Sequence, residues 1–129
     1  MEGLLWSDDR VLRNVRWSLE TTEVARTANG SLGTASEPVL ALPQEGAAYV
    51  WRTWNEGDWM APLGLSGRKN VSDLLTDAKV PSFSRKSYPV LASQESDNEV
   101  VWIPGIRQSQ SVAVQETSRT FWKFRAHYL

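Results

Sequence analysis

Residues 69–91 read KNVSDLLTDAKVPSFSRKSYPVL and contain the clearest periodic pattern in the chain. Apolar side chains recur there at the i, i+3, i+4 and i+7 spacing of one helix face, namely at Val71, Leu74, Leu75 and Ala78. Asn70 is placed to cap the helix N-terminus, and Pro81 stops the helix because the residue before proline avoids helical geometry. The pattern predicts a helix over about 71–79 with its apolar stripe turned toward a core.

A second, shorter helix is expected immediately downstream. Ser82 can cap it, and Pro89 ends it, which gives about 83–87. The two helices therefore form one small helical insert between regions whose pattern is quite different.

Strand patterns dominate on both sides of the insert. Short runs rich in β-branched and aromatic residues alternate with turn-forming Asn, Asp, Gly and Pro. The expected strands are 11–20, 38–42, 47–54, 89–92, 99–103, 111–115 and 120–128. The loop 93–98 joins two of them as a hairpin, and 55–58 and 104–105 are expected turns. The prediction is a single α+β domain over 1–129, mostly antiparallel and β-sandwich-like, with two short helices.

The residue inventory excludes several classes of active site. The chain has no cysteine, and His127 is its one histidine, which leaves no thiolate metal site and no Ser-His-Asp triad. Neither GxxxxGK[ST] nor GxGxxG occurs. Asp73 and Asp77 share a helix face, but a solvated face with neighbouring cations is the better interpretation. A free-standing enzyme is therefore poorly supported, and no catalytic or metal-binding residue is predicted.

Charge is distributed unevenly along the chain. The formal net charge is -1, yet residues 64–91 hold five basic and two acidic side chains. The basic ones are Arg68, Lys69, Lys79, Arg85 and Lys86, and Arg107 follows a nearby turn. Trp54 and Trp59 flank the 55–58 turn, where an indole can stack on a base. These features indicate an anionic partner, although charge alone fits a solvated surface equally well.

Four motifs occur in order within residues 51–107. They are WRTWNEGDWMAPLG at 51–64, KNVSDLLTDAKVP at 69–81, RKSYPVL at 85–91 and VWIPGIR at 101–107. Together they resemble the C-terminal domain of bacterial tRNA(Ile)-lysidine synthetases, with this stretch as the motif-bearing core. The resemblance implies a β-rich sandwich with short helices, a module shared with the β chain of phenylalanyl-tRNA synthetase.

The resemblance also implies a function. The family uses ATP to convert the wobble cytidine of tRNA(Ile) to lysidine, and this ligase chemistry belongs to an N-terminal domain with an SGG.DS loop. This chain has no such loop. It is expected to bind no cofactor itself, ATP and Mg²⁺ being held by the catalytic domain of the parent protein. Its expected role is tRNA recognition at the acceptor stem.

Candidate contacts and partners follow from the matching motif positions. The implied RNA-binding residues are Arg52, Lys69, Lys79, Arg85 and Arg107, and the implied turn-formers are Gly57, Asp58, Pro104 and Gly105. Expected partners are the tRNA(Ile) acceptor stem, the parent's own N-terminal catalytic domain and, in a homodimer, a second copy. A cytoplasmic location without a membrane is expected. The alternative is a structural docking or dimerisation module that does not bind RNA directly.

Overall fold

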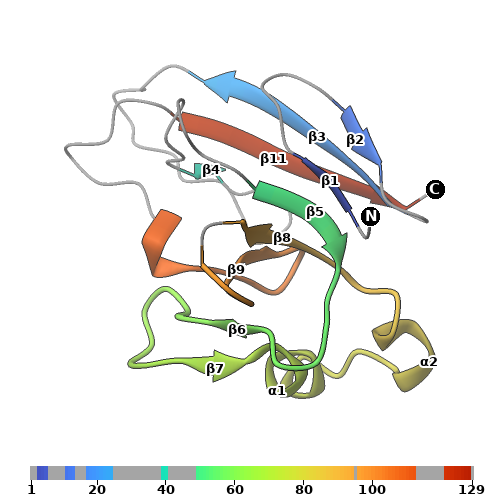
Figure 1. Ribbon diagram of the computed structural model, residues 1–129, viewed down its shortest axis with the longest axis vertical. Coiled ribbons are helices and arrows are strands. Elements are labelled where there is room, and N and C mark those ends of the chain that lie inside the picture. Colours follow the sequence, from blue (N-terminus) through green and yellow to red (C-terminus); the bar gives the residue numbers. More distant parts are fainter. Residues whose placement is uncertain are drawn as a thin grey trace.

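The computed structural model describes residues 3–5, 11–13, 17–24, 39–40, 49–94, 96–112 and 121–128. These residues form three antiparallel sheets and two short helices, which confirms the predicted α+β class (Figure 1). The five-stranded sheet has the order β1 (Gly3–Leu5), β5 (Tyr49–Thr53), β8 (Pro89–Ser93), β9 (Val100–Ile103) and β10 (Arg107–Gln108). The four-stranded sheet has the order β2 (Val11–Arg13), β3 (Trp17–Val24), β11 (Phe121–Tyr128) and β4 (Val39–Leu40). A small ribbon pairs β6 (Trp59–Met60) with β7 (Lys69–Asn70).

The five-stranded sheet lies between two layers and has a hydrophobic cluster on each face. One cluster faces the four-stranded sheet (Figure 1) and contains Leu19, Trp51, Leu91, Val101, Trp102 and Val112. Trp51 and Trp102 stack at 6.1 Å between ring centroids in this cluster. Burial on both faces explains why β8 and β9 are almost continuously apolar instead of alternating with polar residues.

A β-bulge adjusts the central hairpin. Leu91 pairs with Trp102 and Ala92 pairs with Val100, so Val101 is an extra residue on its strand. Val101 and Trp102 are neighbours in sequence and still belong to the same hydrophobic cluster. The hairpin predicted around the 93–98 loop is confirmed by this antiparallel pairing.

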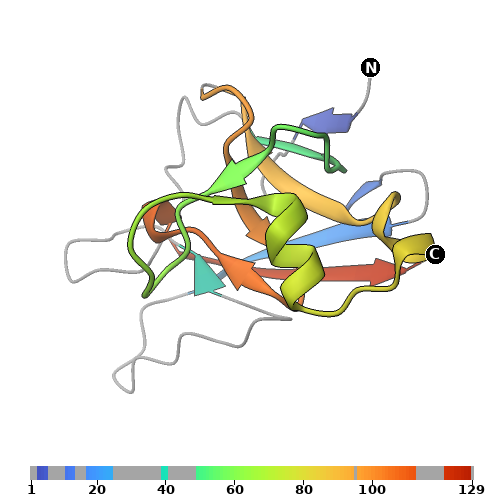
Figure 2. The same ribbon diagram turned by 90° about the horizontal axis from the view of Figure 1, so that it is seen from below.

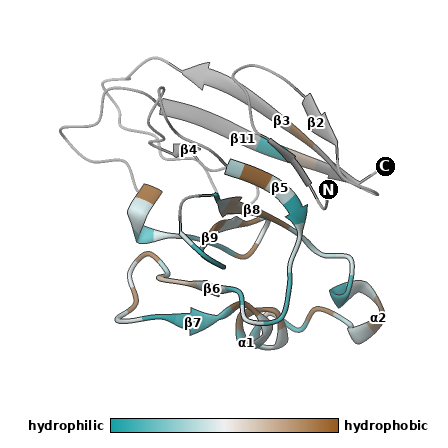
Figure 3. Ribbon diagram, in the orientation of Figure 1, coloured by the Kyte–Doolittle hydropathy of each residue, from teal (hydrophilic) through white to brown (hydrophobic). Residues whose placement is uncertain are grey.

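The second cluster lies under the helical insert. Helix α1 (Val71–Asp77) and β6 supply part of it, and the five-stranded sheet supplies the rest; its members are Met60, Val71, Leu74, Leu75, Val90, Ala92, Val100 and Ile103. Seen from below, α1 crosses in front of the strands (Figure 2). In the hydropathy colouring β7 is clearly hydrophilic (Figure 3). Helix α1 thus covers one face of the sheet and presents the polar residues Asp73, Thr76 and Asp77 to solvent.

Both predicted helices exist, with corrected ends. Helix α1 stops at Asp77, so Ala78 is a C-cap residue exposed to solvent and does not extend the buried stripe as expected. Asn70 occupies the N-cap position, but its side chain makes no capping hydrogen bond. Helix α2 spans Ser82–Arg85, with Pro81 rather than Ser82 at the N-cap.

Two predicted strands are also wrong in part. The expected strand 11–20 is two antiparallel strands, β2 and β3, since Leu12 pairs with Leu19. In this register Leu12 and Leu19 share one face of the sheet, whereas a single continuous strand would place them on opposite faces. Ser111 belongs to a 3₁₀ turn, Gln110–Val112, because its N–H donates to the Ser109 hydroxyl instead of a strand ladder. Residues 113–115 lie outside the described part.

No helix within the described ranges is long and apolar enough to cross a bilayer.

Candidate functional site

The turn after β5 is organised around a buried carboxylate. Gly57 has φ 92°, a left-handed value that favours glycine, and the Asp58 N–H donates to the Asn55 carbonyl at 3.0 Å. This geometry directs the Asp58 side chain inward, where it is fully buried. The predicted turn over 55–58 is therefore confirmed.

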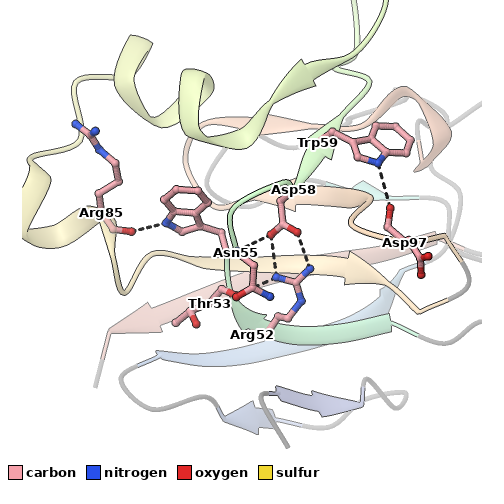
Figure 4. A network of polar contacts seen from close by, with 8 residues as sticks. Arg52, Thr53, Asn55, Asp58, Trp59, Arg85 and Asp97 are labelled. Atoms are coloured by element: carbon pink, nitrogen blue, oxygen red, sulfur yellow. Dashed lines mark hydrogen bonds and ion pairs between the residues drawn. The ribbon is translucent and has the colours of Figure 1, made fainter.

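Asp58 holds Arg52 through two parallel hydrogen bonds. The Arg52 Nη1 and Nη2 atoms donate to the carboxylate at 2.8 and 3.0 Å, and the Asn55 N–H adds a third bond at 2.7 Å (Figure 4). The Asp58 carbonyl also accepts from the N–H of Val71, the first residue of α1. One aspartate thus joins β5, the turn and the helix, and the Arg52 guanidinium is committed to it.

Arg85 has a similar internal role at the end of α2. Its Nη2 donates to the Val80 carbonyl at 3.1 Å, while its own carbonyl accepts from the indole N–H of Trp54 (Figure 4). Its Nε is buried and has no hydrogen-bond partner among the residues that the structure describes. Trp54 packs against the second cluster, so its indole supports the core instead of lying free for a base.

Tyr88 connects the α2 region to the 104–105 turn. Its hydroxyl donates to the Pro104 carbonyl, and Gly105 completes the predicted turn with φ 74°. Burial disfavours the phenolate and raises the pKa of Tyr88 above its ordinary value of 10.0.

Replacing Tyr88 with Phe tests this contact. Because the folded pKa is raised, the neutral hydroxyl contributes stability that is complete below pH 10.0 and is lost as pH rises through the folded pKa. Tyr88→Phe should cost about 0.5–1.5 kcal/mol at neutral pH through the lost hydrogen bond. Under alkaline conditions the free energy of unfolding should also fall less steeply with pH for the variant than for the unsubstituted chain. Urea melts across pH measure both, and identical alkaline slopes would contradict the assignment.

Three of the predicted RNA contacts are exposed. Lys69 lies on β7 before α1, Lys79 follows α1, and Arg107 lies on the edge strand β10. The Leu63 N–H donates to the Gln108 carbonyl at 3.0 Å, which places the loop before β7 beside β10. Lys69 and Arg107 therefore belong to neighbouring segments, while Lys79 lies at the other end of α1.

Lys79 has an unusual backbone. Its φ is 61°, in the left-handed region where side-chain-bearing residues are strained. The Val80 N–H donates to Leu75 and the Lys79 N–H to Thr76, a helix-ending pattern that normally carries glycine at this position. The chain thus has an exposed lysine where glycine is favoured.

Trp59 and Arg68 form a contact that the sequence did not reveal. The Arg68 Cζ lies 3.8 Å from the Trp59 ring centroid, and the indole N–H donates to the Asp97 carbonyl at 3.1 Å (Figure 4). The β6–β7 ribbon responsible has two residues per strand, too few to show an alternating pattern.

The acidic side chains of α1 face solvent. Asp73 and Asp77 are exposed, and neither makes a salt bridge with any residue that the structure describes. Across the same residues, no group of three or more His, Cys, Asp or Glu side chains is placed to hold a metal ion. Gly64 and Gly67 lie in an exposed turn, with β7 between them and α1.

Comparison with known proteins gives a consistent result for the motif-bearing core. A family model described as the TilS substrate C-terminal domain matches residues 50–124, more than half of the chain. The tRNA(Ile)-lysidine synthase of Geobacter sulfurreducens is 39% identical over 75 residues, which cover 57% of this chain and 15% of that protein. The Bacillus subtilis enzyme of the same name is 30% identical over 78 residues, 59% of this chain and 16% of that protein. The chain thus spans about 15% of the length of such relatives.

A solved structure shares the fold. The crystal structure of a TILS C-terminal domain matches with a TM-score of 0.67 over 88% of this chain and 85% of that chain. Sequence identity between the two is 18%. The likeness supports the arrangement of sheets and helices described above.

Proposed function

The chain belongs to the family of TilS substrate C-terminal domains, and from this premise we propose that it is a tRNA-binding module that contacts the acceptor stem of tRNA(Ile). Relatives that contain a matching segment are named tRNA(Ile)-lysidine synthases. In the proposal, the parent's N-terminal domain carries out the ATP-dependent conversion of the wobble cytidine, and this chain holds the substrate. The parent protein is then the enzyme, and this chain contributes binding alone.

The single observation that carries the proposal is Lys79. A left-handed backbone costs a side-chain-bearing residue about 1–2 kcal/mol, and glycine would remove that cost. The exposed Lys79 side chain makes no hydrogen bond or ion pair with any described residue, so it gives the fold little in return. Strain at an exposed cation is what a binding role for the side chain would explain.

The other cations fit recognition of an RNA backbone. A-form RNA hides its major-groove base edges and presents phosphates and 2′-hydroxyl groups. Lys69 and Arg107 are exposed and can approach phosphates directly. Arg52 and Arg85 remain candidates from the family motifs, but each guanidinium already serves an internal contact. We therefore assign the larger share of RNA affinity to the three exposed residues.

Lys79→Gly should separate binding from stability. Relief of strain should leave the free energy of unfolding unchanged or raise it by up to about 1 kcal/mol. Affinity for an acceptor-stem minihelix should nevertheless fall, and the slope of log K against log salt should flatten by roughly one counterion. Fluorescence anisotropy with a labelled minihelix measures the affinity.

Asn98→Gly is the matched control, because Asn98 is the other non-glycine residue at positive φ in the described ranges. It relieves the same kind of strain without removing a charge and keeps the backbone carbonyl that accepts from the Trp59 N–H, so its RNA affinity should equal that of the unsubstituted chain. Equal affinity for Lys79→Gly and Asn98→Gly would contradict a role for Lys79.

ATP binding is assigned to the parent's catalytic domain. The motivation is that neither an SGG.DS loop nor GxxxxGK[ST] occurs in this sequence. Isothermal titration of this chain with ATP and Mg²⁺ should give no measurable heat of binding. A micromolar dissociation constant would overturn the assignment.

Phe83 favours a second candidate function, docking against a protein surface. Its side chain is 85% exposed on α2, and burial against a partner would remove this apolar surface from water. The partner would be the parent's catalytic domain or a second copy of this chain. Docking and RNA binding predict opposite salt dependence, since apolar contacts do not weaken as salt rises.

A further inference from the structure

Arg68 is an exposed cation whose position is set by an aromatic ring. The β6–β7 ribbon pairs Trp59 with Asn70, so Arg68, two residues before Asn70, is a diagonal neighbour of Trp59 on the same face. The guanidinium carbon lies over the indole, 3.8 Å from its centroid. This is the short range in which a cation is attracted to the face of a tryptophan.

The indole beneath Arg68 is itself fixed. Its ring N–H donates to the Asp97 carbonyl at 3.1 Å, and its backbone N–H donates to the Asn98 carbonyl at 2.9 Å. Trp59 also forms a bridge to Glu99. The ring is thereby anchored to the loop between β8 and β9, and Arg68 rests on a platform that cannot easily rotate away.

The contact leaves the hydrogen-bonding capacity of Arg68 available. A ring face accepts no conventional hydrogen bond from a guanidinium stacked on it, and Arg68 makes no ion pair or hydrogen bond with any other residue of the described segments. Guanidinium groups bind phosphate through two parallel N–H donors. An immobilised guanidinium loses less conformational entropy when it does so.

We propose that Arg68, held by Trp59, is a phosphate-binding residue for the RNA backbone, with Trp59 as its positioning residue. The inference rests on the proposed RNA-binding function and adds a site to it. Arg68 directly precedes Lys69, and the loop that contains it lies beside the strand of Arg107. The proposed phosphate site therefore extends the surface that those two exposed cations already define.

The test is a set of titrations with an acceptor-stem minihelix at several salt concentrations. Arg68→Ala should weaken binding by about tenfold at low salt, the loss expected for hydrogen bonds to a charged group. Arg68→Lys should keep the salt slope of the unsubstituted chain yet still lose affinity, because lysine cannot form the two parallel hydrogen bonds to phosphate. Arg125→Ala, on β11 in the opposite sheet, removes the same charge and should change affinity little.

Trp59→Leu tests the positioning role. It should weaken binding by about threefold while leaving the charge in place, since a cation–π contact at an exposed site contributes only modestly. The double variant Arg68→Ala, Trp59→Leu should bind no more weakly than Arg68→Ala alone. Because Arg68 is exposed, its two single variants should fold even if Trp59→Leu does not.

Three results would overturn the inference. If the unsubstituted chain binds RNA and Arg68→Ala has the same affinity as Arg125→Ala, the phosphate site fails while the proposed function stands. If the losses from Trp59→Leu and Arg68→Ala are additive, the positioning role fails. If the unsubstituted chain shows no salt-dependent binding, the proposed function and the phosphate site fail together.

Discussion

Replacing Asp58 with Asn should lower the free energy of unfolding by about 3–5 kcal/mol, the cost of breaking a buried ion pair from one side. Asp58 is fully buried and accepts both Arg52 donors at 2.8 and 3.0 Å. An amide preserves the shape of the side chain but leaves the guanidinium of Arg52, whose side chain is 12% exposed, without its counter-charge. The 55–58 turn and the start of α1 should loosen together, because Asp58 connects them.

The matched control for this variant is Asp77→Asn. It makes the same chemical change at an exposed position on α1, where the effect should stay within about 0.5 kcal/mol. Urea denaturation of both variants provides the comparison. Equal losses would mean that the Arg52–Asp58 pair contributes nothing specific to the fold.

Leu75→Ala should lower the free energy of unfolding by about 2–5 kcal/mol. Leu75 has no exposed surface and packs in the cluster beneath α1, where truncation leaves a cavity among Val90, Val100 and their neighbours. Leu65→Ala is the matched control, since Leu65 is 39% exposed and its truncation should cost less than about 0.5 kcal/mol. A loss below that same value for Leu75→Ala would show that the helix does not cover the sheet.

The local periodic parts of this fold were predictable from sequence. Leu74 and Leu75 mark the buried face of α1, and the turn residues around Gly57 and Gly105 mark the ends of strands. Each of these features depends on residues within one or two turns of chain. The hairpin of β8 and β9 was predictable for the same reason, because both strands are continuous apolar runs around a polar loop.

Contacts that depend on the turns themselves were not predictable. The sequence motifs mark Arg52 as an RNA contact and Asp58 as a turn-former, yet the turn brings the two together as a buried pair. Arg68 and Trp59 are nine positions apart and meet because a two-residue ribbon aligns them. Sequence spacing identified the basic residues, but not which of them an internal partner already holds.

The backbone strain at Lys79 was likewise not predictable from the sequence. The stripe predicted for the helix included Ala78, which implies a helix that continues through that residue. The helix instead ends at Asp77, and the next turn forces Lys79 into the left-handed region. The helix end, and with it the strongest argument for a binding role, emerges from backbone hydrogen bonds that no periodic pattern encodes.

The most direct test of the RNA-binding proposal is the salt dependence of binding between this chain, without substitutions, and a minihelix of the isoleucine acceptor stem. Log K should fall linearly with log salt, with a slope that corresponds to about three or four phosphate contacts at roughly 0.7–0.9 counterions each. That range matches contributions from Lys69, Lys79, Arg107 and Arg68. Absence of salt-dependent binding at low ionic strength would contradict the RNA role and leave docking against a protein surface as the function of this domain.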